Sequence, residues 1–314
     1  MMKNKELLGV SAVVVLLFLF GALRYENFFS AYNLLEFGRY NTMFALISIG
    51  MAFVIMTGGI DLSVGTVAAL GSVVSALLSP HSALGAIVAG TLAGTACGFV
   101  NGLVITRMRI QPFIATLAMT LAAHGLALLL ANNQAVSPSY ETGFTEFGQG
   151  DWLGIPVPMW VLLGVLALAG VAHVYTAFGR HTLAIGGSEE AAKLIGLNVN
   201  HKLLLVYVLS GTLAGLAGVF LAAQGSGQPN EGMGWDLFAI SAVVVGGTLL
   251  SGGAGSIAAT MVGVVLLGLI FNLLNFENGL GQFTLSSYWQ SVVRGVFLLI
   301  VVVIQARLLK QRAH

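Results

Sequence analysis

The stretch from Gly58 to Ala69 reads GGIDLSVGTVAA, and the stretch from Gly246 to Ala259 reads GGTLLSGGAGSIAA. Aligned on their paired glycines, the two share Leu, Ser and Gly at matching positions and rejoin at Ala-Ala after a two-residue insertion. The likeness indicates an internal duplication. Each stretch interrupts apolar sequence and is therefore predicted to break a helix. Breaks at corresponding places in two halves point to a central binding site in a membrane protein. Glycines also permit close helix packing, and the sequence leaves both readings open.

Apolar sequence surrounds both breaks. Hydrophobic residues make up 57% of the 314 residues, charged residues only 8%, and the mean hydropathy is +0.92. Soluble domains carry about 25% charged residues, so the bilayer is the expected solvent. Helices satisfy their own backbone hydrogen bonds in lipid. The sequence predicts an all-α polytopic membrane protein with a single domain (residues 1–314) and about ten transmembrane helices, at Leu7–Leu23, Met43–Thr57, Leu62–Ser79, Leu84–Ile105, Pro112–Ala131, Val157–Thr176, Leu203–Ala223, Leu237–Leu250, Ile257–Asn275 and Trp289–Ile304.

Basic residues near the span ends predict the orientation of the chain. With a cytoplasmic N-terminus, ten of the thirteen Lys and Arg fall inside, and only Arg24 and Arg39 fall outside, in agreement with the positive-inside rule. Ten spans then place both termini in the cytoplasm of a bacterial inner membrane. The first run has no small-residue cleavage site and is predicted to stay uncleaved. The basic residues are scattered and form no patch that would bind nucleic acid. Cys97 is the single cysteine, which excludes an intrachain disulfide.

Two short spans and two long loops stand out. The second and eighth runs have only about 15 residues, fewer than a full crossing needs, and are predicted to be half-helices. The outer loop, residues 132–156, is expected to form a partly ordered cap. The inner loop, residues 177–202, contains a predicted short helix, 188–195, with Ser188 as its cap, acids in its first turn and Gly196 as its stop. A short helix on the cytoplasmic face is a natural docking element.

Candidate pathway residues are polar but mostly uncharged. Asp61 lies in the first break, where it could cap the next helix or contact a solute. Neutral polar side chains near other span ends are Ser63, Asn101, Gln111, Thr116, Gln228 and Asn230. Phe113 and Trp235 offer apolar faces for a sugar ring, or belong to an interfacial belt. This composition favours a neutral polyhydroxylated solute. His124 and His173 are interpreted as core residues, and no metal site or cofactor is predicted.

The chain lacks a phosphate-binding loop, since no G-x-x-x-x-G-K-[ST] motif occurs. If ATP drives transport, another chain must hydrolyse it. An ion-coupled carrier that uses Asp61 is the alternative. No constellation of acids, bases or metal ligands favours an enzyme.

Several motifs, in order, resemble one known family: the permeases of ribose-type ATP-binding cassette (ABC) sugar importers, in the wider group that includes branched-chain amino-acid permeases. The motifs are TGGIDLSVGTVAAL (57–70), QPFIATLAM (111–119), AIGGSEEAAKLIGLNV (184–199), QPNEGMGWDLFAISAVVVGGTLLSGGAGS (228–256) and SSYWQ (286–290). The resemblance implies an all-helical permease that pairs with a second copy or a paralogue, two cytoplasmic ATPase subunits and a periplasmic sugar-binding protein. It also implies a coupling helix that inserts into the ATPase, formed by Gly187, Glu189, Glu190, Ala191, Lys193 and Gly196.

The same resemblance leaves the sugar open among ribose, another pentose, a hexose and a polyol. The stretch LNFENGLGQFTLSSYWQ is similar to a permease of a galactofuranose importer, which implies assembly as a heterodimer. One departure is Phe238, which stands where family members commonly carry an acid. We expect this change to alter the outer mouth of the eighth span.

Overall fold

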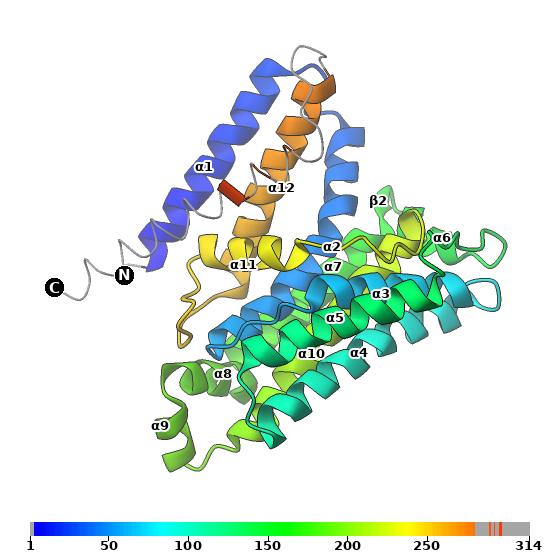
Figure 1. Ribbon diagram of the computed structural model, residues 1–314. Helices are drawn as coiled ribbons and strands as arrows, with labels where there is room; N and C mark the ends of the chain where they lie inside the picture. Colours follow the sequence, from blue (N-terminus) through cyan, green and yellow to red (C-terminus); the bar gives the residue numbers. More distant parts are fainter. Residues whose placement is uncertain (1–2, 280–288, 290–291, 293–294, 297–314) are drawn as a thin grey trace.

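The computed structural model describes residues 3–279, 289, 292 and 295–296, and within these it is a bundle of helices (Figure 1). The tenth predicted span, 289–304, lies largely outside the described residues. The helices are α1 (Lys3–Arg24), α2 (Ala31–Met56), α3 (Val64–Leu78), α4 (Ala83–Arg107), α5 (Pro112–Leu130), α6 (Phe144–Gln149), α7 (Val157–Tyr175), α8 (Ala177–Gly187), α9 (Glu189–Leu194), α10 (Val199–Gln224), α11 (Trp235–Val245) and α12 (Ile257–Gly279).

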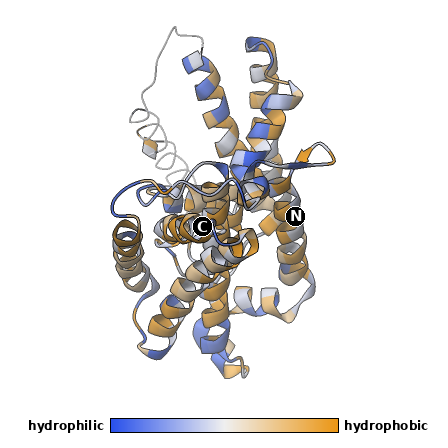
Figure 2. Ribbon diagram, turned by 90° about the vertical axis from the view of Figure 1, so that its right-hand side faces the viewer, coloured by the Kyte–Doolittle hydropathy of each residue, from blue (hydrophilic) through white to orange (hydrophobic). Residues whose placement is uncertain are grey.

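Six of the described helices, α2, α4, α5, α7, α10 and α12, are long and apolar enough to cross a membrane. Three further apolar helices are shorter: the apolar part of α1, α3 and α11. Figure 2 shows hydrophobic residues on the outward faces of most helices. Leu121, Leu129 and Leu168, for example, are each more than two-thirds exposed. Exposed leucines on long apolar helices fit a surface that faces lipid.

The prediction of a short second span was wrong. Helix α2 has 26 residues and begins twelve residues before the predicted start. Its polar first part remains helical because Ser30 caps it, accepting a hydrogen bond from the Asn33 N–H at 3.2 Å, and because Arg39 pairs with Asp151 at 2.9 Å. The eighth run, in contrast, forms the 11-residue α11. At 1.5 Å per residue α11 extends about 16 Å, about half of the hydrocarbon thickness.

Helix α10 lies at the centre, against α2, α3 and α4. Glycines bring α4 and α10 into backbone contact: a Cβ on Gly94 would lie 2.3 Å from the Gly211 carbonyl oxygen, and one on Gly98 would lie 2.2 Å from the Tyr207 carbonyl oxygen. Glycine recurs at every fourth position of α4 from residue 90 to residue 102. This small-xxx-small spacing is the usual way in which membrane helices approach closely.

The loop at residues 132–156 is ordered and covers one end of the bundle. It contains α6 and a hairpin of two short strands, β1 (Asp151–Trp152) and β2 (Ile155–Pro156). The loop is held by hydrogen bonds from the Gln149 side chain to the Ala223 carbonyl at 3.2 Å and from the Ser139 N–H to Ser79 Oγ at 2.8 Å. Helix α9 lies at the opposite end of the bundle from this loop (Figure 1).

Candidate functional site

The first break begins where α2 ends. Gly58 has a left-handed backbone, with φ of +83°, and its N–H donates to the Ile55 carbonyl at 2.8 Å. The N–H of Gly59 donates back to the Val54 carbonyl at 3.2 Å. These two bonds form a Schellman motif, which satisfies the last carbonyls of a helix and favours glycine at the left-handed position. The chain therefore leaves the helix axis before Asp61.

Asp61 is buried, with 1% of its surface exposed. One carboxylate oxygen accepts from the Ser63 N–H at 3.0 Å and from Ser63 Oγ at 2.6 Å, and the other accepts from Ser210 Oγ of α10 at 2.8 Å. Of the two alternatives left open for Asp61, capping of the following helix needs correction. Helix α3 begins at Val64 with Ser63 as its N-cap, so the carboxylate instead ties the residues before the helix to α10.

Two further predicted residues join this network. Asn101 of α4 donates its amide to Ser63 Oγ at 3.0 Å. Thr116 of α5 accepts from the Leu62 N–H at 3.2 Å. Asp61, Ser63, Asn101 and Thr116, four of the nine predicted pathway residues, thus lie together, and all four are buried. Their hydrogen bonds are made with one another, with Ser210 and with the backbone, which is the arrangement of a structural anchor rather than of an open channel.

The other five predicted pathway residues lie elsewhere. Gln111 lines a cavity of about 620 Å³ between the first break at Gly58 and Gly59, the α4–α5 turn, α9 and α10, and the Phe113 beside it is exposed. At the far end of the bundle, the Gln228 N–H donates to Ser72 Oγ at 3.1 Å, and Asn230 Oδ1 lies 3.2 Å from His124 Nε2. Trp235 is buried, with its ring 4.9 Å from that of Phe44. The nine residues do not line one cavity.

The predicted short helix on the inner loop is confirmed as α9. Ser188 Oγ accepts from the Ala191 N–H at 3.2 Å, and Gly196, with φ of +84°, ends the helix. The Gly196 and Leu197 N–H groups close a Schellman motif there. Glu189 and Lys193 pair across one turn. Beside the exposed Glu190, Leu194 and Ile195 are 88% and 73% exposed, so α9 presents acidic and apolar side chains outward together.

The last turn of α8, just before α9, packs on both breaks. A Cβ on Gly186 would lie 1.9 Å from the Met56 carbonyl oxygen and 2.5 Å from the Gly253 nitrogen. The Gly253 N–H also donates to that Met56 carbonyl at 3.0 Å. Three backbone segments therefore meet at Gly186: the last turn of α8, the end of α2 and the second break.

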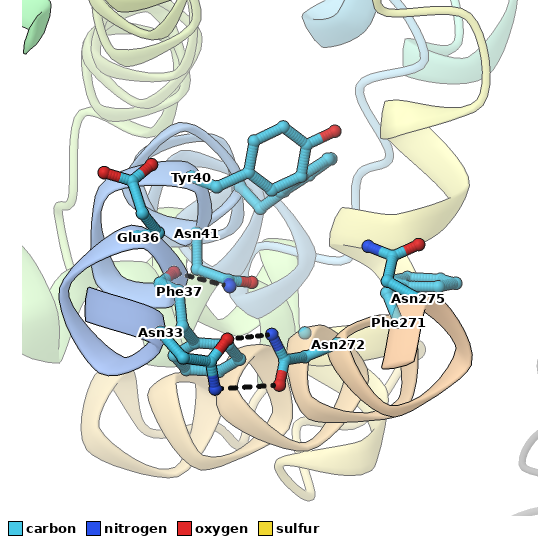
Figure 3. A pocket seen from close by; sticks show the side chains of 10 residues that line it. Asn33, Glu36, Phe37, Tyr40, Asn41, Phe271, Asn272 and Asn275 are labelled. Carbon is cyan, nitrogen blue, oxygen red and sulfur yellow. Dashed lines mark hydrogen bonds between the residues drawn. The ribbon is translucent and has the colours of Figure 1, made fainter. Parts of the chain in front are cut away.

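A second cavity, of about 210 Å³, lies between α2 and α12, and the sequence analysis did not identify it. Figure 3 shows its amide and aromatic side chains, which come from both helices. Its lining residues are Asn33, Glu36, Phe37, Tyr40, Asn41, Phe44, Gly268, Phe271, Asn272 and Asn275. The signal was present in the sequence as amides at helical spacing in α2 and α12. It was missed because the predicted second span began at Met43, after the polar turns.

Phe238 is not at a mouth of the bundle. It is 6% exposed and its ring lies 4.4 Å from that of Phe44 and 6.0 Å from that of Phe271. The structure therefore does not place Phe238 at an outer mouth. Phe238 instead makes an aromatic contact behind the α2–α12 cavity. In the part of the chain that the structure describes, no group of three or more His, Cys, Asp and Glu could hold a metal ion.

A family model described as the branched-chain amino acid transport system / permease component matches residues 33–302. The ribose import permease protein RbsC of Escherichia coli (strain K12) is 39% identical, over 97% of this chain and 94% of that protein. RbsC of Bacillus subtilis (strain 168) is 38% identical, over 98% and 94%. The L-arabinose transport system permease protein AraH of Escherichia coli (strain K12) is 37% identical, over 94% and 89%. No solved structure gives a significant match.

Proposed function

The chain belongs to the family described as the branched-chain amino acid transport system / permease component, and from this we propose that it carries a pentose, ribose or L-arabinose, through an ABC importer. It is a multi-pass inner-membrane permease, and a transport subunit rather than an enzyme. The observation that carries the proposal is the 39% identity with a ribose import permease over nearly the whole of both chains. A galactofuranose importer, a hexose and a polyol rank behind the two pentoses, because the relatives compared are named for ribose and L-arabinose.

The full topology is part of the proposal. Ten spans form one permease domain, with the tenth at 289–304 and with both termini in the cytoplasm. In this orientation α9 lies on the cytoplasmic side and the loop 132–156 on the outer side, consistent with their places at opposite ends of the bundle (Figure 1). The chain leaves the helical path at both glycine pairs, between α2 and α3 and between α11 and α12. The short α11 is a half-helix that ends at the second of these breaks.

Coupling to ATP hydrolysis is assigned to α9 and its flanks: Gly187, Glu189, Glu190, Ala191, Lys193 and Gly196. The exposed acidic first turn of α9 and the exposed apolar side chains at its end support this assignment. When the partner ATPases close, they move α9, and the contact at Gly186 passes this motion to both breaks. Differential affinity of the partners for the two permease conformations supplies the coupling.

This docking role predicts the effect of Glu190→Arg. Charge reversal should lower sugar uptake and ATPase co-purification while membrane insertion stays intact. Glu141→Arg, a matched reversal at an exposed residue of the loop 132–156, should leave ATPase co-purification unchanged. Unchanged uptake in the Glu190 variant would count against the docking role.

The remaining partners and residues complete the proposal. A loaded periplasmic sugar-binding protein docks on the loop 132–156 and delivers sugar to a pathway at the axis of a permease dimer, formed with a second copy or a paralogue. Asp61, Ser63, Asn101 and Thr116 hold the first break beside that pathway. Gln228, Asn230 and Trp235 serve its outer end, and Gln111 and Phe113 its inner end. Lipid surrounds the exposed apolar helices.

Reconstitution tests the function. The permease, its ATPase and its binding protein in vesicles should hydrolyse ATP faster when D-ribose or L-arabinose is present, and should accumulate that sugar. The permease alone should accumulate none. Accumulation by the permease alone under an ion gradient would instead favour an ion-coupled carrier, and Asp61→Asn would then abolish it.

A further inference from the structure

The α2–α12 cavity extends deep into the bundle. Its deepest residue on α2 with a polar side chain is Asn41, ten residues from the start of the helix, or about 15 Å at 1.5 Å per residue. Gly268 on α12 lies eleven residues from the end of that helix, or about 16 Å. The hydrocarbon core is about 30 Å thick. The cavity therefore extends about 15 Å along both helices, a length of about half the hydrocarbon thickness.

The amides of the cavity need an explanation. Asn41 is the deepest of them, and polar groups in the hydrocarbon region are costly and usually functional. One pair has a structural explanation. Asn33 and Asn272 exchange two hydrogen bonds, at 3.0 and 3.4 Å (Figure 3), as amides do when they join membrane helices. This pair holds α2 and α12 together at the wall of the cavity.

Two other amides are not explained by helix pairing. The Asn41 amide nitrogen donates to the Phe37 carbonyl of its own helix at 2.8 Å. Its oxygen lies toward α12, where a Cβ on Gly268 would be 2.0 Å away, so glycine at 268 leaves room for it. Asn275 is exposed, and Figure 3 shows no hydrogen bond from its amide to the other residues that line the cavity. Both amides retain capacity to bind something in the cavity.

The lining fits a small neutral polyol ring. An amide both donates and accepts, which suits hydroxyl groups that do the same. Tyr40, 51% exposed, and Phe271 add aromatic faces to the walls. The single carboxylate, Glu36, already pairs with Arg39 at 3.1 Å. A volume of about 210 Å³ is below the range of roughly 300 to 1,000 Å³ that holds drug-sized ligands, so one small ring is the appropriate size.

We infer that this cavity is a monosaccharide subsite of the transport pathway, with Asn41 and Asn275 as its hydrogen-bonding groups and Tyr40 as an aromatic wall. The inference rests on the proposed function and adds to it a place where the sugar sits after its release from the binding protein. None of the nine pathway residues expected from the sequence lines this cavity.

Uptake kinetics test the subsite. In vesicles with ATPase and binding protein, Asn275→Ala should lower the uptake rate of D-ribose or L-arabinose about tenfold, the effect of one lost hydrogen bond of about 1.4 kcal/mol. The matched control is Asn278→Ala, the same change one turn further along α12 at a residue outside the lining, which should alter uptake less than about twofold. Equal uptake by the two variants at equal expression would overturn the inference.

A labelling experiment gives a readout that a merely structural role would not change. Tyr40→Cys in a Cys97→Ser background should react with a membrane-impermeant thiol reagent, and excess D-ribose should slow that reaction at least about threefold. Tyr140→Cys, in the exposed loop 132–156, should react at the same rate with and without sugar. Absence of labelling at residue 40, or labelling that no tested pentose slows, would contradict a sugar subsite.

The two proposals fail in distinguishable ways. If the wild-type complex accumulates a pentose but residue 40 is not protected and Asn275→Ala transports normally, the subsite is wrong and the importer stands. If the wild-type complex responds to no sugar, the proposed function itself is wrong.

Discussion

The two glycine-paired breaks end their helices in the same way and then differ. At the second break, the Gly247 N–H donates to the Val244 carbonyl at 2.9 Å and the Thr248 N–H donates to the Val243 carbonyl at 3.2 Å, with φ of +87° at Gly247. This is the same Schellman motif as at Gly58. In the structure Gly58 therefore corresponds to Gly247, so the alignment on the first glycines is shifted by one residue.

After that motif the first break turns into the buried interior, whereas the second packs against the backbone of the first break and of α8. The first continues into buried Asp61, whose carboxylate accepts three hydrogen bonds. The second continues into the exposed Ser251 and then two glycines, Gly252 and Gly253, with φ of +81° and +76°. A similar sequence signal thus produces a polar anchor in one half and a close backbone contact in the other. Four pairs of substitutions test this contrast.

The largest effect is expected at the contact shared by both breaks. Gly186→Ala places a Cβ against the Met56 carbonyl and the Gly253 nitrogen, and backbone atoms cannot move aside as a flexible side chain can. We expect a loss of about 3 kcal/mol of stability, measured by unfolding in mixed micelles, together with loss of uptake. Gly187→Ala is the control for stability, because its Cβ meets nothing within 4 Å. Equal stability of the two variants would show that the breaks are not locked at this point.

The second largest effect is expected at the polar anchor. Asp61→Ala leaves the Ser63 N–H and the Ser210 hydroxyl without their acceptor, at a cost of about 2 kcal/mol. Asp61→Asn keeps one acceptor oxygen and should lose less than half as much in the same unfolding assay. It should also retain sugar uptake with the ATPase present. A complete loss of uptake in a stable Asp61→Asn protein would contradict a purely anchoring role.

The shared motif predicts equal costs at its two glycines. Gly58→Ala and Gly247→Ala each force an alanine into the left-handed region, which costs about 1 kcal/mol. At Gly58 the nearest contact of the new Cβ is 3.4 Å from the Ser251 carbonyl oxygen, so backbone strain should dominate. Melting temperatures of the two purified variants should fall by the same amount. A cost confined to one of them would break the correspondence between the two helix ends.

The smallest effect is expected at the serine of the second break. Ser251 is exposed, so Ser251→Ala should change stability by less than about 0.5 kcal/mol. Ser63→Ala, at the position aligned with it in the sequence, removes a buried hydroxyl that bonds both Asp61 and Asn101 and should cost about 1 kcal/mol. Denaturation of the two variants side by side measures the difference. Equal costs would mean that both breaks carry polar anchors.

The sequence alone determined the class of the protein and its local signals. Low charge and long apolar runs require a helical membrane protein, because backbone groups in lipid must be satisfied within each segment. The capped helix after Ser188 and the interruptions at both glycine pairs could also be predicted, since caps and left-handed glycines act through neighbours in the chain. The motifs identified the family for the same reason, as they are contiguous in the sequence.

Only the tertiary structure decided which polar residues share a site. Asp61 and Ser210 are 149 positions apart, and Asn33 and Asn272 are 239 apart, so no local pattern links them. The length of α2 was likewise misjudged because its polar first turns are stabilised by contacts with α12 and with the hairpin. Local sequence fixes where a helix ends, whereas long-range packing decides which of its side chains are anchors and which line a cavity.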